Sequence, residues 1–155
     1  MIEYMILAIE EAKKGIDSFH GGPFGAVIVK GDEIIAKAHN TVLLTKDPTK
    51  HAEMNAISEA SRKLKNFDLS GCSIYSTTEP CPMCFSAIHW AKIDKIYFGT
   101  TIEDVAKLGF NELAVSNETL KKLGDLKVEL INATMKKECR ELLSYWKGLS
   151  NKGTY

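Results

Sequence analysis

Residues 73–99 read SIYSTTEPCPMCFSAIHWAKIDKIYFG, a strand–helix–strand pattern from which the architecture of the chain can be inferred. Ser73–Ser76 and Lys95–Gly99 are short apolar and aromatic runs, which are typical of buried strands. Between them, Pro80–Trp90 begins with proline and continues as an apolar helix. Because parallel neighbouring strands need a crossover connection, usually a helix, this unit predicts an α/β fold.

The sequence before this unit predicts an antiparallel hairpin between two helices. Residues 2–16 have the apolar spacing of an amphipathic helix, and residues 50–65 predict a second helix. Residues 24–29 and 33–38 predict two strands, because a Gly-Asp pair forms a tight turn between them. Together with the central unit, this hairpin predicts a mixed sheet.

The C-terminal third is less regular. One or two short helices are expected in residues 102–124, a strand at residues 127–131, and a last helix with an apolar face from Met135 to Leu149. The order of elements predicts a three-layer α/β domain in which the hairpin is followed by helix-linked parallel strands. At 155 residues, without a linker or repeat, the chain is expected to be a single domain, 1–155.

The charge balance and the apolar content argue against several classes of partner. Twenty Lys and Arg residues against twenty Asp and Glu residues give a net charge of zero, which disfavours a nucleic acid partner. No apolar run approaches the roughly 20 residues that a membrane-spanning helix needs. No basic region precedes an apolar stretch at the N-terminus. We therefore expect a cytoplasmic protein with no membrane partner, whose four cysteines are reduced thiols.

Two short motifs, HAE at residues 51–53 and PCPMC at residues 80–84, bring together residue types that zinc prefers as ligands. Cys81 and Cys84 are three residues apart at the start of a predicted helix, where both can face one point. The free N–H groups of a helix start also favour thiolate over thiol. His51 can join them if it lies at the entrance of its own helix. The sequence therefore predicts Zn²⁺ bound by His51, Cys81 and Cys84.

The residue types around this predicted site favour catalysis. Three protein ligands leave a fourth position open, as in catalytic zinc sites, where zinc lowers the pKa of a bound water to about 7. Glu53 is not needed as a ligand, so its carboxylate can move protons. Zinc deaminases carry His-x-Glu followed by Pro-Cys-x-x-Cys, with the Glu as general acid and base. Every part of this pattern is present in order, so Glu53 is the predicted catalytic residue.

Other interpretations of these residues remain open. The Cys-x-x-Cys pair could be a redox pair or half of a structural zinc site, and a zinc-stabilised binding module without turnover is the non-enzymatic alternative. Glu53 argues against the binding module, because a structural site needs no carboxylate beside its histidine. Cys72 and Cys139 are expected to pack as small apolar residues. Trp90 and Trp146 are expected in the core.

With these motifs, the chain resembles the cytidine deaminase-like superfamily from about Gly22 to its C-terminus. It is most similar to bacterial guanine deaminases, whose segments are matched by GGPFGAVIV at residues 21–29, AIHWAK at residues 87–92, AKLGF at residues 106–110 and the terminal Tyr155. The resemblance implies a three-layer α/β/α sandwich with a five-stranded mixed sheet. It also implies zinc-dependent hydrolytic deamination of a nucleobase, namely guanine to xanthine and ammonia.

The resemblance assigns substrate contacts position by position. Phe24 would stack on the base, Asn40 would hydrogen-bond it, and Tyr155 would close over it. The backbone at Ala52 and Cys81 would help to position groups near the developing alkoxide. Family members form dimers, some by exchanging the C-terminal segment, so a homodimer is expected here.

One departure from the guanine deaminase pattern leaves the substrate open. The acidic pair that follows Gly-Phe in those enzymes reads Asn111-Glu112 here. Either Glu112 contacts the purine ring with a longer side chain, or the change signals another base or a nucleoside. A tRNA adenosine deaminase is one alternative, since such enzymes share DPT at residues 47–49 and both metal motifs. Deamination of guanosine or cytosine is another.

Overall fold

The computed structural model describes residues 2–150 and 152–155, and in this part of the chain five strands form one sheet in the order β2-β1-β3-β4-β5. The strands are β1 (Gly25–Lys30), β2 (Glu33–His39), β3 (Cys72–Thr78), β4 (Lys95–Thr100) and β5 (Glu129–Ile131). β1 pairs antiparallel with both β2 and β3, whereas β3, β4 and β5 run parallel. The predicted mixed sheet is confirmed.

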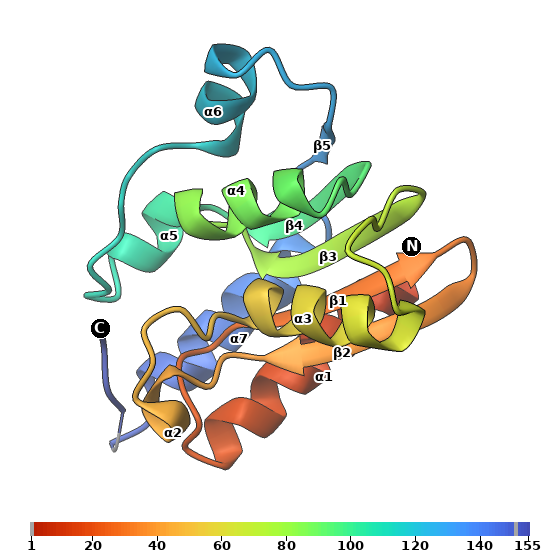
Figure 1. The fold of residues 1–155 in the computed structure, drawn as a ribbon. Helices are drawn as coiled ribbons and strands as arrows, with labels where there is room; N and C mark the ends of the chain where they lie inside the picture. The colour runs from red at the N-terminus through yellow and green to blue at the C-terminus, as the bar shows by residue number, and fades with distance from the viewer. Residues whose placement is uncertain (1, 151) are drawn as a thin grey trace.

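Helices cover both faces of this sheet. Those of the described residues are α1 (Ile2–Asp17), α2 (Val42–Thr45), α3 (Ala52–Leu64), α4 (Pro82–Trp90), α5 (Ile102–Ala106), α6 (Asn117–Leu123) and α7 (Lys136–Lys147). Figure 1 shows α3 and α4 on one face and α1 and α7 on the other. The predicted three-layer α/β/α sandwich is therefore confirmed.

Alternation along β1 builds a core on each face, because successive side chains of a strand point to opposite sides. Ala26 and Ile28 pack in the core beneath α3 and α4. Val27 and Val29 pack in the opposite core with α1. β1 lies inside the sheet, so both of its faces are apolar, as its sequence indicates.

Some sequence predictions need correction. The short helix α2 was not predicted, and β5 begins at Glu129 rather than at residue 127. Trp90 was expected in the core but is 78% exposed, because it is the last residue of α4 and that helix packs through Cys84, Phe85 and Ile88. Trp146, like Cys72 and Cys139, is buried as expected.

The helices α3 and α4 begin at the same end of the sheet, next to the carboxyl end of β3 (Figure 1). In open α/β sheets this end is the usual place for ligand sites. No helix in residues 2–150 has both the length and the hydropathy needed to cross a membrane.

Candidate active site

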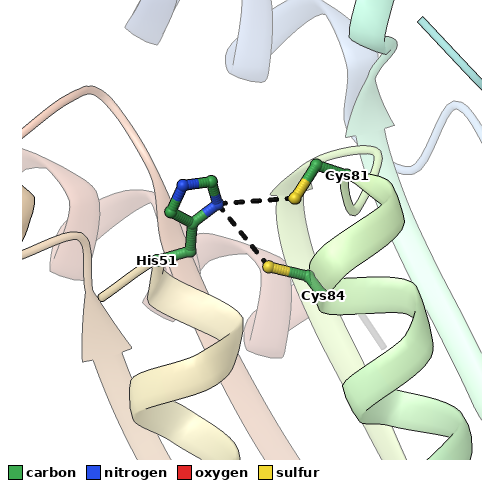
Figure 2. A group of neighbouring side chains, drawn as sticks. All are labelled: His51, Cys81 and Cys84. Atoms are coloured by element: carbon green, nitrogen blue, oxygen red, sulfur yellow. Dashed lines mark hydrogen bonds between the residues drawn. The ribbon is translucent and has the colours of Figure 1, made fainter. Parts of the chain in front are cut away.

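The histidine and the two cysteines of the sequence motifs meet where α3 and α4 begin. Figure 2 shows the His51 ring facing both sulfur atoms across the gap between the two helices. His51 Nδ1 lies 3.5 Å from Cys81 Sγ and 3.6 Å from Cys84 Sγ. The three donor atoms all lie within 4.8 Å of one another, and they form the one such group found in the described residues.

Local helix geometry explains how residues distant in sequence come together. His51 is the N-cap of α3 and has an extended backbone. Its side chain therefore projects from the N-terminal end of the helix and not from the side of a helical turn. Cys81 is likewise the N-cap of α4, and Pro82 occupies the first helical position, where its missing N–H costs no intrahelical bond. Glu53 falls in the first turn of α3, two residues after His51.

The chain before His51 is held by one amide side chain. Asn55 Nδ2 donates to His39 O at 2.9 Å and to Thr41 Oγ1 at 3.0 Å, and it contacts Lys50 O at 3.4 Å. These bonds tie the end of β2 and the loop before α3 to the first turns of that helix. His51 therefore lies between two segments that are bonded to each other, the loop that ends at Lys50 and the helix that carries Asn55.

The ionisable groups of the site influence one another strongly. Hydrogen bonding from Cys84 and from His51 lowers the pKa of Cys81 to about 4, against the opposing effect of burial. The pKa of Cys84 is raised well above its ordinary value by the Cys81 thiolate and by burial. Burial disfavours protonation of His51, but its hydrogen bond with Cys81 and the charge of Glu53 raise its pKa overall. Even without a metal, one sulfur is therefore held as a thiolate.

The donor set fits zinc in both chemistry and spacing. Zinc binds thiolate at about 2.3 Å and imidazole at about 2.0–2.1 Å, so that two such ligands of a tetrahedral ion lie about 3.6 Å apart. The sulfur–nitrogen distances of 3.5 and 3.6 Å match this value. Two thiolates and one imidazole can therefore hold Zn²⁺ with little rearrangement and leave one position for another ligand.

Glu53 lies beside this donor set as a buried carboxylate. Its Oε1 accepts a hydrogen bond from Ser76 Oγ at 2.8 Å, and its Oε2 lies 3.5 Å from the Cys84 sulfur. Burial, and secondarily the negative charge of Cys81, raise the pKa of Glu53 above its ordinary value. A carboxyl group with a raised pKa can both accept and return a proton near neutral pH.

A cavity of about 290 Å³ opens over the donor set and Glu53. Phe24, Phe110 and Tyr155 contribute aromatic walls, and Glu112 contributes a carboxylate. The Phe24 and Phe110 rings lie edge to face with centroids 5.2 Å apart, and the Tyr155 ring lies 6.4 Å from that of His51. A small, partly aromatic cavity with a few polar groups is typical of a site for a flat ring.

The predicted substrate contacts are placed as follows. Phe24, Glu112 and Tyr155 line the cavity, while Asn40 and Ala52 are buried outside its lining. Asn40 Oδ1 accepts from the backbone of α2, whereas its Nδ2 has no hydrogen-bond partner in the described residues. Burial, and secondarily the negative charge of Cys81, raise the pKa of Glu112 to about 7.

The C-terminal residue reaches this cavity from the far end of the chain. The Tyr155 hydroxyl accepts a hydrogen bond from Gly22 N at 3.2 Å, and Tyr155 O accepts one from Asn111 N at 3.0 Å. These bonds join the C-terminus to the loop before β1 and to the loop after α5. The terminal residue therefore forms part of the cavity wall.

Sequence reasoning missed several residues of the site. Ser76 holds Glu53, Asn55 holds the loop before His51, and Phe110 forms a wall. The signal for Ser76 was a polar side chain in a strand otherwise built for burial. Asn55 could have been noticed as a short amide inside a helix, where it competes for backbone groups.

Comparisons with known proteins show which family the chain resembles. Residues 1–100 match the family model described as the cytidine and deoxycytidylate deaminase zinc-binding region. The chain is 35% identical over 148 residues to the guanine deaminase of Bacillus subtilis, covering 96% of this chain and 94% of that one. It is 50% identical over 97 residues to a tRNA-specific adenosine deaminase of Aquifex aeolicus, covering 62% and 64%.

A solved structure supports the same grouping. The guanine deaminase of Nitrosomonas europaea superposes with a TM-score of 0.87 at 26% identity. The match covers 96% of this chain and 85% of that one.

Proposed function

Because the chain belongs to the cytidine and deoxycytidylate deaminase family, whose members carry this zinc-binding region, we propose that it converts guanine and water into xanthine and ammonia. It is a hydrolase that acts on the C–N bond of a cyclic amidine. The observation that carries the proposal is the convergence of a His/Cys/Cys donor set, the buried Glu53 carboxylate and aromatic walls on one cavity.

The metal site of this enzyme would be formed by His51, Cys81 and Cys84. When bound there, zinc supplies Lewis acidity, which brings the pKa of a water molecule down to about 7. The thiolates balance the charge of the ion, and the N-cap positions of His51 and Cys81 aim their donors away from the helix axes. The protein thus supplies a preorganised donor set.

Glu53 would move the protons of the reaction. Its carboxylate takes a proton from the attacking water and passes it to a ring nitrogen as a C–O bond forms at the carbon that bears the amino group. It then takes the proton of the newly attached hydroxyl group and gives it to the amino group, which leaves as ammonia as the C–N bond breaks and the C=O bond forms. The hydrogen bond from Ser76 fixes the orientation of the carboxylate throughout.

The base would be held by residues from four separate segments. Phe24 stacks on the ring and Tyr155 closes over it, supported by their position in the cavity wall. Asn40, which lies outside the cavity lining in this structure, would donate from its buried Nδ2 after its side chain moves toward the base. Glu112 accepts from N–H groups of the purine, and the Ala52 backbone helps to position the reacting group.

A tRNA-specific adenosine deaminase is the second candidate, supported by the high identity over residues shared with such an enzyme. The net charge of zero favours a free base instead, because it disfavours a large polyanion. Tyr155 and Glu112 both line the cavity beside His51 and Cys81, where they can contact a small flat ring. We therefore rank guanine first.

The test is ammonia release by purified protein with its zinc content quantified. Guanine, guanosine, adenine, cytosine, cytidine and a tRNA anticodon stem-loop are compared under the same conditions. We expect turnover of guanine well above that of every other substrate. Turnover of the stem-loop with none of guanine would favour the second candidate, and zinc binding with no turnover would favour the non-enzymatic binding module.

We also propose that the chain is a single domain, works in the cytoplasm and forms a homodimer, in which the C-terminal segment could be exchanged. The four free thiols support a reducing location. Light scattering at several protein concentrations tests the dimer. A mass of 17.2 kDa at all concentrations would contradict it.

A further inference from the structure

The cavity wall that carries Glu112 belongs to the long connection between α5 and α6 (Figure 1). Residues 107–109 form a turn, and residues 110–116 have no regular secondary structure. This segment contributes Phe110, Asn111, Glu112 and Leu113 to the cavity. Irregular backbone has few hydrogen bonds of its own, so its position depends on where its ends are anchored.

A single carboxylate bonds the first residue of each of the two helices that flank the segment. Glu79 Oε2 accepts a hydrogen bond from Ile102 N, the first residue of α5, at 3.3 Å. Glu79 Oε1 accepts one from Asn117 N, the first residue of α6, at 2.8 Å. Glu79 therefore joins the start of the helix before the wall to the start of the helix after it.

The same carboxylate is rigidly attached to the metal-binding loop. Glu79 directly follows β3, lies two residues before Cys81, and donates its own N–H to Thr100 O at 2.8 Å. Asn117 adds a second link, since its Nδ2 donates to Pro80 O at 2.6 Å. Asn117 is fully buried and Glu79 is 8% exposed, so water is largely kept from these bonds.

Both carboxylate oxygens are used as acceptors for backbone donors. No ion pair with Glu79 occurs in residues 2–150 or 152–155, so the partners of its two oxygens are these two N–H groups. A glutamine has the same shape but one acceptor oxygen, and its NH₂ group would face a backbone N–H. The arrangement thus needs a carboxylate specifically.

We propose that Glu79 is a positioning residue, which fixes the cavity wall of Phe110–Leu113 relative to the metal-binding loop and thereby sets the affinity for the base. The proposal rests on the proposed function, in that Glu112 is taken to contact the substrate. Glu79 also lines the cavity, but both of its carboxylate oxygens accept from backbone N–H groups. It therefore acts through the backbone at Ile102 and Asn117, and its carboxylate does not take part in the proton transfers assigned to Glu53.

The test compares Glu79→Gln with the unaltered protein, both loaded with zinc. We expect KM for guanine to rise about tenfold, which corresponds to about 1.4 kcal/mol of binding free energy, with kcat within about threefold. Zinc stoichiometry should be unchanged. Hydrogen–deuterium exchange should be faster in residues 107–117 but not in α3 or α4. Glu79→Asp, which keeps both acceptor oxygens on a shorter side chain, should give intermediate values.

Asp104→Asn is the matched control. Asp104 caps the start of α5 through Thr101, at the same helix end, but makes no bond to α6. Replacing the Asp104 carboxylate by an amide should leave KM for guanine unchanged. The proposal is overturned if zinc-loaded Glu79→Gln keeps the KM and the exchange rates of the unaltered protein, or if Asp104→Asn raises KM equally.

Two further outcomes are also decisive. If the unaltered protein does not turn over guanine, the proposed function fails, and the exchange rates alone decide whether Glu79 anchors the wall. If Glu79→Gln cannot be purified, Glu79→Asp takes its place. An unchanged KM and unchanged exchange rates in Glu79→Asp then overturn the proposal.

Discussion

Glu53 shows how much of the chemistry depends on the surroundings of one side chain. An exposed glutamate is fully ionised near neutral pH and a poor proton donor. Here burial and the neighbouring thiolate raise its pKa, while the Ser76 hydroxyl holds one oxygen in place. The residue is therefore suited to return the proton that it accepts.

Replacing Glu53 by Gln tests this role. The amide keeps the shape and the contact with Ser76 but cannot take a proton, so we expect kcat to fall by about 10²–10⁴-fold with zinc retained. Steady-state ammonia release and zinc analysis measure the two effects. Glu59→Gln is the control, since Glu59 lies on the same helix but outside the cavity, and it should retain activity. Equal activity in both variants would remove Glu53 from the mechanism.

At the scale of elements, the close packing of α1 against β1 depends on a glycine in the strand. A Cβ on Gly25, the first residue of β1, would lie 2.0 Å from Ala8 O and 2.8 Å from Ala12 N. Both are backbone atoms of α1, so they cannot move aside without shifting the helix. Gly25 thus allows α1 to pack directly against β1, the strand that follows Phe24 of the cavity wall.

Gly25→Ala should therefore destabilise the protein. Overpacking of this kind costs about 1–3 kcal/mol, and we expect the upper end or more because the clash is with backbone. Urea unfolding measures the loss. Gly148→Ala, at a site where the nearest atom is 3.6 Å from the added Cβ, should change stability by less than about 1 kcal/mol. Equal stability of the two variants would show that α1 can shift freely.

The link between α1 and β2 predicts a dependence of stability on pH. Glu11 of α1 bonds Lys14 at 2.6 Å and lies 3.4 Å from His39 of β2. Burial raises the pKa of Glu11, but these partners outweigh it and hold the pKa below its ordinary value. A group with a depressed pKa in the folded state stabilises the fold above its unfolded pKa, and this contribution is lost as pH falls through the folded pKa.

Urea unfolding of the unaltered protein and of Glu11→Gln between about pH 7 and about pH 3 tests this link. The unaltered protein should be the more stable one at the upper end, and the difference should shrink below about pH 4. A difference that stays constant or grows as the pH falls would contradict the sign of the shift.

At the scale of the whole molecule, the cavity is closed by segments from opposite ends of the chain. The hydroxyl of Tyr155 accepts from Gly22 N, and the two residues are 133 positions apart. The loop after α5, held at Asn111, completes the enclosure. The wall of the cavity therefore depends on where Tyr155 lies.

Tyr155→Phe tests this closure. It removes the acceptor of the buried Gly22 N–H, and a loss of about 1 kcal/mol would raise KM for guanine about fivefold. Tyr145→Phe is the matched control, because it removes an exposed hydroxyl that bonds Asp17 and lies away from the cavity. If the two variants have the same KM as the unaltered protein, the Tyr155 hydroxyl has no part in closing the site.

The sequence alone determined the architecture and predicted His51, Cys81 and Cys84 as the candidate zinc ligands. The strand–helix–strand unit at residues 73–99 and the hairpin before it predicted a mixed sheet, because periodicity and turn residues act over short distances. The donor set followed from HAE at residues 51–53 and PCPMC at residues 80–84, because the spacing of ligands at helix starts is itself a local property. The structure places those donors within 4.8 Å of one another.

Only the tertiary structure decided which other side chains face the cavity and how its wall is held. Ser76 bonds Glu53, Asn55 bonds His39 and Glu79 bonds Asn117, at separations of 23, 16 and 38 positions. Such pairings depend on how strands and loops pack, and no pattern within a short window reports them. The exposure of Trp90 has the same origin, since an apolar side chain is buried only where another element covers it.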